Sequence, residues 1–183
     1  NSTPISPTPP AGWALDSAPV TLDAGSADIT LDNSGNTFGT LELTGANATV
    51  NEAAATDLGT SNLTGDLALT SAGGINFGGP LSAQGNVSLN AAGEITQAAP
   101  LVIGGNLDAA TTVNAGDVSI DNSGTATTLG DSEVGGNYAV TATGGTVTQA
   151  LDSAIQVAGD LTVTADTVDL TGAANLVGGT TSL

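Results

Sequence analysis

The chain has 183 residues with no Lys, Arg or His and 18 Asp and Glu residues, so its formal net charge is −18 at pH 7. Nucleic-acid binding is excluded because it depends on cations that neutralise phosphate, and an anionic membrane surface repels such a chain. Without Cys the chain has neither disulfides nor thiolate metal sites, and no apolar run approaches the roughly 18 residues of a membrane span, so we expect no membrane insertion.

Residues 1–15 form the first segment, which holds four of the seven prolines and shows no strand alternation. Proline at this density favours an extended, polyproline-like arm. Two interpretations stay open. The segment is a linker, or it is an arm that docks on a neighbouring copy through Pro9, Pro10 and Trp13.

Residues 16–183 form one repeat domain. A Gly followed by Asn or Asp and an apolar-x-apolar triplet recurs at GDLAL (65–69), GNVSL (85–89), GNLDA (105–109), GDVSI (116–120), GNYAV (136–140) and GDLTV (159–163). The spacings between these glycines are 20, 20, 11, 20 and 23 residues, so the short one indicates half a turn. Alternation with period two predicts short strands, and the recurring period of about twenty predicts stacked repeats.

Short strands, two or three per unit, fit one coil of a parallel β-solenoid, in which each strand pairs with those about 4.8 Å above and below. We therefore predict an all-β fold, a parallel β-solenoid of about eight coils that follows the Pro-rich arm. One inward column is expected to hold Leu67, Val87, Leu107, Val118, Tyr138 and Leu161. The Asn and Asp residues at 66, 86, 106, 117, 137 and 160 are expected to stack as one ladder. An antiparallel β-sandwich stays open as the alternative, because it also has short strands at close spacing.

Units such as GDLTVTADTVDLTGAA (159–174) and GNVSLNAAGEITQ (85–97) resemble the degenerate coils of the filamentous-haemagglutinin-like secreted exoproteins of bacteria. The resemblance covers about residues 20–178. It implies a right-handed parallel β-helix, export across the outer membrane, and an adhesive or biofilm-matrix role. The family's amino-terminal secretion domain is not evident in this chain, and the absence of all cations departs from typical members.

The composition also bears on catalysis. Nucleophilic triads need a His or Lys base, and a phosphate-binding loop needs its Lys. Only a pair of carboxylates is open to this chain. We therefore expect no enzyme activity and no cofactor, with a polysaccharide-active β-helix enzyme as the remaining catalytic alternative.

Calcium binding is a separate hypothesis. Asp28, Asp32, Asp117 and Asp121 occupy the matched segments DITLDNSGNT (28–37) and DVSIDNSGTA (117–126), and carboxylate oxygens are ligands that Ca²⁺ prefers. We take these four residues as candidates for weak calcium binding. The competing explanation is that the carboxylates cap the backbone of their turns.

These patterns predict a building block of a secreted or cell-surface fibre, an adhesin or biofilm-matrix filament. We expect it to associate with itself head to tail or as coils of a longer chain. The chain has no Met, which predicts a processed product or a segment of a longer protein. The alternative is a carbohydrate-binding module of a larger adhesin, with host or matrix glycans as partners. That module would have only Trp13, Phe38, Phe77 and Tyr138 to stack on sugars.

Overall fold

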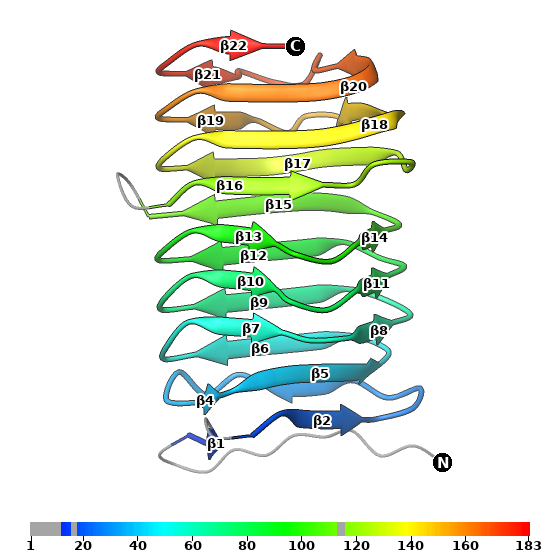
Figure 1. Ribbon diagram of the computed structural model, residues 1–183, viewed down its shortest axis with the longest axis vertical. Helices are drawn as coiled ribbons and strands as arrows, with labels where there is room; N and C mark the ends of the chain where they lie inside the picture. Colours follow the sequence, from blue (N-terminus) through cyan, green and yellow to red (C-terminus); the bar gives the residue numbers. More distant parts are fainter. Residues whose placement is uncertain (1–11, 16–17, 113–115) are drawn as a thin grey trace.

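The computed structural model describes residues 12–15, 18–112 and 116–183 and confirms the parallel β-solenoid of about eight coils (Figure 1). Every regular element in these residues is a strand, and 20 of the 22 strands form one continuous sheet. The strands are β1 (Ala14–Leu15), β2 (Val20–Asp23), β3 (Ile29–Leu31), β4 (Thr37–Phe38), β5 (Thr40–Gly45), β6 (Ala48–Glu52), β7 (Thr56–Leu58), β8 (Ser61–Leu63), β9 (Leu67–Ser71), β10 (Ile75–Phe77), β11 (Leu81–Ala83), β12 (Val87–Ala91), β13 (Ile95–Gln97), β14 (Leu101–Ile103), β15 (Asn106–Thr111), β16 (Val118–Asp121), β17 (Thr127–Val134), β18 (Tyr138–Gln149), β19 (Ile155–Val157), β20 (Leu161–Asp169), β21 (Leu176–Val177) and β22 (Thr181–Ser182).

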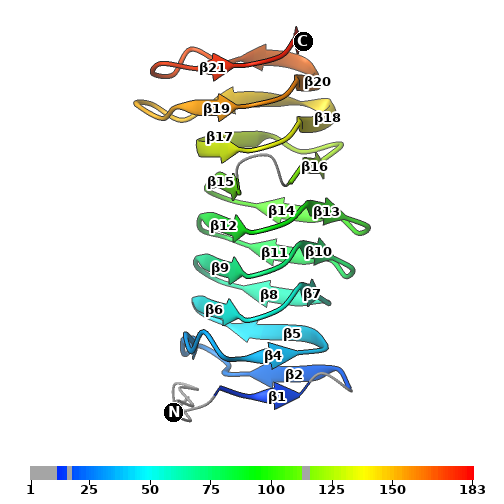
Figure 2. The same cartoon turned by 90° about the vertical axis from the view of Figure 1, so that its left-hand side faces the viewer.

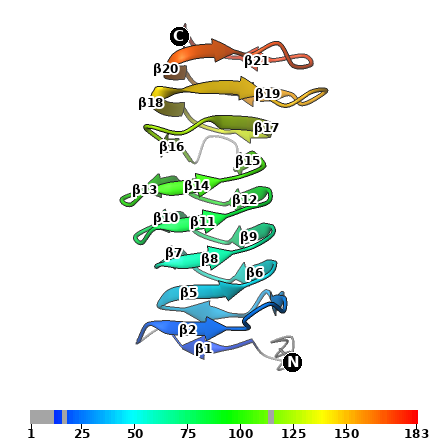
Figure 3. The ribbon, with the colours of Figure 1, turned by 90° about the vertical axis from the view of Figure 1, so that its right-hand side faces the viewer.

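Each coil in the middle of the stack consists of three strands. The strands β9, β10 and β11 make one coil and pair in parallel with β12, β13 and β14 of the next, residue for residue. Figure 2 shows β6, β9 and β12 stacked along one side and β7, β10 and β13 along another, and Figure 3 shows the stack of β8, β11 and β14. In Figure 1 the near strands run to the right and the far strands return to the left as the chain rises, so the coil is right-handed.

The core lies inside the coils because residues alternate between the interior and the solvent along every strand. In β9 and β12 the first, third and fifth residues are buried and the other two are exposed. The largest fully buried side chains are Tyr138 and Phe77, and most of the others are Leu and Ile. Tyr138 therefore points inward, as its place in the repeat predicts. No coil could bury these side chains alone, so burial between neighbouring coils stabilises the stack.

The predicted single column is wrong at one point. Leu67, Val87 and Leu107 are stacked as expected, but the next residue in that column is Leu129 rather than Val118. Val118 stacks instead between Ile95 and Tyr138, on the side of the solenoid that β7, β10 and β13 form. The physical reason is the spacing of 11 residues between two of the repeat glycines, which carries the chain only to the next side of the coil.

The described part of the amino-terminal segment lies against the first coils. The strand β1 pairs in parallel with β4, and the Trp13 backbone N–H donates to Asn36 Oδ1 at 2.8 Å. Parallel pairing thus begins before residue 16. Trp13 is 38% exposed. The proposed contact residues Pro9 and Pro10 lie outside the described residues, so self-association through this arm stays a prediction.

Candidate binding groove

The Asn and Asp residues of the repeat form two ladders rather than the single predicted one. In the first ladder each backbone N–H donates to the side-chain Oδ1 of the residue one coil below, at 2.7–3.1 Å, through Asp28, Asn47, Asp66, Asn86 and Asn106. The second ladder repeats this bond at 2.7–2.9 Å through Asp117, Asn137, Asp160 and Thr180. The prediction of one ladder fails for the same reason as the column, because the short spacing moves Asp117 to another corner.

These ladders explain why Gly precedes the Asn or Asp. A Cβ atom at Gly85 would collide with Asp66 Oδ1, and one at Gly136 would collide with Asp117 Oδ1. The same clash with the ladder residue of the coil below recurs at Gly65, Gly105, Gly159 and Gly179. The ladder oxygen therefore occupies the space that any other side chain would need.

The four calcium candidates are not brought together. Asp28 accepts hydrogen bonds from Asn47, and Asp117 accepts one from the Asn137 backbone N–H. Asp121 caps its own turn through the backbone N–H and hydroxyl of Ser123, while Asp32 is exposed directly after β3. Within the described ranges no three acidic residues lie close enough to hold a metal ion. Calcium binding stays a prediction, and backbone capping describes three of these carboxylates.

Carboxylates are kept apart along both ladders. The first reads Asp–Asn–Asp–Asn–Asn and the second Asp–Asn–Asp–Thr, so no two carboxylates are on adjacent coils of a ladder. Carboxylates two coils apart are separated by about 9.6 Å, which is comparable to the Debye length of about 8 Å at physiological salt. The pKa of Asp160 is lowered because the Thr180 backbone N–H and hydroxyl both donate to its carboxylate.

Asp108 and Asp131 show what happens where carboxylates do come close. The pKa of Asp108 is raised, first by partial burial and then by the negative charge of Asp131. Asp131 Oδ1 meanwhile accepts the backbone N–H of Ala154 at 2.9 Å. With no cation in the chain to compensate the charge, this proximity opposes ionisation of Asp108.

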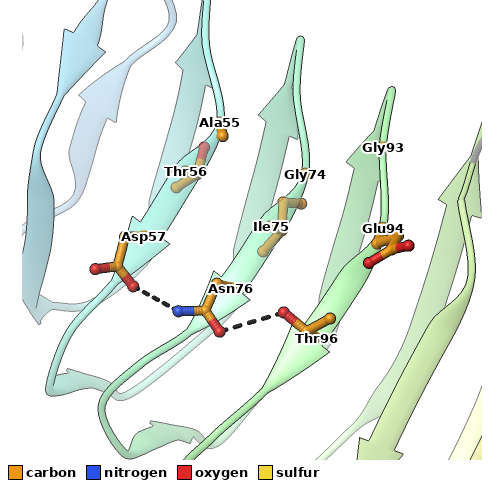
Figure 4. A pocket seen from close by; sticks show the side chains of 9 residues that line it. All are labelled: Ala55, Thr56, Asp57, Gly74, Ile75, Asn76, Gly93, Glu94 and Thr96. Carbon is orange, nitrogen blue, oxygen red and sulfur yellow. Dashed lines mark hydrogen bonds between the residues drawn. The ribbon is translucent and has the colours of Figure 1, made fainter.

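A row of polar side chains crosses the outer face of β5, β7, β10 and β13. Thr40 Oγ1 donates to Asp57 Oδ2 at 3.0 Å, Asn76 Nδ2 donates to Asp57 Oδ1 at 2.9 Å, and Thr96 Oγ1 donates to Asn76 Oδ1 at 3.2 Å. Figure 4 shows Asp57, Asn76 and Thr96 side by side on three successive strands. Each residue sits between two inward-facing neighbours of a paired strand, so the backbone fixes its direction.

The polar row borders a shallow groove of about 450 Å³ across β7, β10 and β13. The other border is formed by small residues at the turns, Ala55, Gly74 and Gly93, with Glu94 at one end. A second hollow of about 450 Å³ shares Ala55 and Asp57 with the first and extends toward Pro19 and Phe38. We call these two adjoining hollows together the coil groove.

A buried carboxyl lies behind the coil groove. Glu52 is 1% exposed, and its Oε1 accepts the Phe38 backbone N–H at 2.7 Å. Its Oε2 and the Thr56 Oγ1 atom are both buried without a hydrogen-bond partner among the described residues. Burial raises the pKa of Glu52, an effect only partly offset by hydrogen bonding.

The residues of the coil groove were missed by the sequence reasoning, which followed the Gly-Asn and Gly-Asp motif. Asp57, Asn76 and Thr96 are the middle residues of the short triplets TDL, INF and ITQ, which recur 19 and 20 residues apart. A polar residue between two inward positions, repeated at the coil period, was the signal that could have found them.

The fold is that of a parallel β-solenoid repeat protein. The chain belongs to the family described as Repeats of unknown function (DUF5649), whose model matches residues 11–44, 45–96, 76–125 and 115–183. No curated protein and no solved structure matches the chain. Across the described residues there is no helix long and apolar enough to cross a membrane.

Proposed function

We propose that the chain is a structural building block of a secreted or cell-surface fibre, with the role of an adhesin or a biofilm-matrix filament. The observation that carries the proposal is the unbroken parallel ladder from β2 to β22, in which each coil is bonded to the next. Such a stack lengthens by the addition of coils without any change in its cross-section. The resemblance to filamentous-haemagglutinin-like repeats supports the same role.

The two ends of the stack also support this role. Among the described strands, β22 pairs only with β20 and β2 only with β5, so each leaves an unpaired edge. Leu176 and Leu183 on the last coil are 66% and 70% exposed. Unpaired edges with apolar side chains are templates for further strands, supplied by more coils of a longer chain or by a second copy.

A structural role is favoured over catalysis by the composition. The chain offers no His, Lys or Cys as base or nucleophile, and its Asp residues in the ladders accept backbone hydrogen bonds. A carboxylate in such a bond has a structural role, because it accepts a hydrogen bond from a backbone N–H in the turn of the next coil.

The proposal is tested by immunogold labelling of cells that produce the protein, with and without permeabilisation. We expect label on extended material outside intact cells. Label that appears only after permeabilisation would refute the proposal, because a fibre for adhesion or matrix must be exposed. A cytoplasmic protein labelled on the same cells controls for leakage.

Negative-stain microscopy of the purified chain then identifies the source of the next coil. Regular filaments indicate stacked copies, and short rods indicate coils of a longer chain. The Leu161 N–H donates to the Thr180 carbonyl, so in a parallel ladder the Thr181 N–H faces the free edge. Thr181→Pro removes that donor and should abolish filaments, whereas Thr181→Val keeps it and should preserve them.

A further inference from the structure

The polar row of the coil groove faces outward, and its hydrogen bonds join neighbouring coils without filling the groove. Asp57 and Asn76 are half-buried and Thr96 is exposed, while the core is closed beneath them by Ile75, which is 1% exposed, and Ile95, which is fully buried. A groove that the fold does not fill, lined by an ordered polar row, is a surface available to a ligand.

The two central residues of the row, Asp57 and Asn76, keep hydrogen-bonding capacity after their bonds within the row. Asn76 has a second amide hydrogen beyond the one that it donates to Asp57, and its carbonyl oxygen accepts only from Thr96. Each Asp57 oxygen accepts one bond and can accept another. The row therefore offers both donors and acceptors at intervals of about 4.8 Å along the stack.

Two ligand classes are excluded by the surroundings of the groove. A polyanion is repelled, because the chain has a net charge of −18 and no cation. A peptide cannot add as a strand, because β7, β10 and β13 are each paired on both sides and have no free edge.

We propose that the coil groove binds a neutral, hydroxyl-rich polysaccharide lying along the axis of the stack. Hydroxyl groups both donate and accept, so they match the mixed donors and acceptors of Asp57, Asn76 and Thr96. From Thr40 to Thr96 the row crosses four coils, roughly 14 Å, which suits a chain rather than a single small molecule. The proposal goes beyond the fibre role and does not depend on it.

The test is native gel electrophoresis of the purified, monomeric chain through gels that contain a soluble polysaccharide. The neutral probes are dextran, a mixed-linkage β-glucan and a galactomannan, and the charged probe is polygalacturonate. We expect retardation by at least one neutral probe and none by the charged one. Retardation by no neutral probe, or equally strong retardation by polygalacturonate, overturns the proposal.

A pair of double variants locates the binding. The groove variant carries Asn76→Ala and Thr96→Ala, and the matched control carries Thr70→Ala and Asn90→Ala, an adjacent pair that points outward from β9 and β12 on another side. The groove variant should bind about tenfold more weakly, as expected for the loss of a few hydrogen bonds, and the control should bind as the parent does. Equal loss in both variants refutes this location, and unfolding in urea verifies that both are folded.

Discussion

The separation of carboxylates along the ladders makes a prediction about stability. Asn86→Asp keeps an oxygen that accepts the Asn106 N–H but places a second carboxylate next to Asp66. Asn137→Asp places a carboxylate between Asp117 and Asp160, so it has two charged neighbours instead of one. The hydrogen bond is preserved in both variants, so the change isolates the repulsion between like charges.

The magnitude follows from the spacing of the coils. Two unit charges 4.8 Å apart in water repel by about 0.9 kcal/mol. We therefore expect Asn86→Asp to lower the free energy of unfolding by about 1 kcal/mol and Asn137→Asp by about 2 kcal/mol. The combined Asp66→Asn and Asn86→Asp variant moves the carboxylate up by one coil, between the new amide at position 66 and Asn106, and should be as stable as the parent.

Urea unfolding at neutral pH, followed by circular dichroism, measures these differences. Each experiment is repeated in 1 M salt, where the Debye length of about 3 Å is shorter than the spacing and the penalties should shrink. Equal losses for Asn86→Asp and Asn137→Asp would refute the reasoning, as would a combined variant no more stable than Asn86→Asp alone.

Three further predictions concern buried and partly buried groups. Glu52→Gln should stabilise the protein at pH 7, because burial disfavours the charged carboxylate that the amide replaces. The parent should lose stability as the pH rises from the ordinary pKa of 4.5 through the raised pKa of Glu52, and identical urea midpoints for parent and variant at every pH would count against this. Asp108→Asn should likewise raise the urea midpoint at neutral pH, because it removes a partly buried charge and its repulsion from Asp131. The gain should vanish in acid, where the parent carboxyl is protonated, and a gain that persists there means another cause. Phe77→Ala should lower the free energy of unfolding by about 3–5 kcal/mol in calorimetry or urea unfolding, and a loss below about 1 kcal/mol would show that the coil closes over the cavity.

The fold could be predicted from the sequence because the coil leaves two independent periods in it. Alternation in segments such as LALTS (67–71) marks the strands, and the return of the glycine after twenty residues marks the coil. An antiparallel sandwich would need no such return, and the structure contains parallel pairs throughout its described strands.

The predicted single column and single ladder were wrong at the point where the twenty-residue period is interrupted. The step from Gly105 to Gly116 is shorter than a coil, and the sequence does not state on which side the next strand comes to lie. That choice depends on packing, because Val118 is buried between Ile95 and Tyr138. The sequence also does not show why Gly must precede the ladder residue, since the oxygen that a Cβ atom would collide with belongs to the coil below.

The coil groove depends on side chains that the sequence places about twenty residues apart. Only the register of β7, β10 and β13 brings Asp57, Asn76 and Thr96 into one row. The calcium candidates were chosen because they occupy the matched segments 28–37 and 117–126. The structure places them in separate turns, with three of the four carboxylates bonded to neighbouring turn groups.

The hydrogen bonds between coils run along the length of the stack, and this orientation has a mechanical consequence. Tension on the two ends acts on one terminal coil at a time, so coils detach singly rather than together. A coil of twenty residues pulled straight measures about 70 Å, compared with the rise of about 4.8 Å that it occupied. We therefore expect each detached coil to lengthen the protein by far more than the coil's own height and to dissipate work as it is stretched.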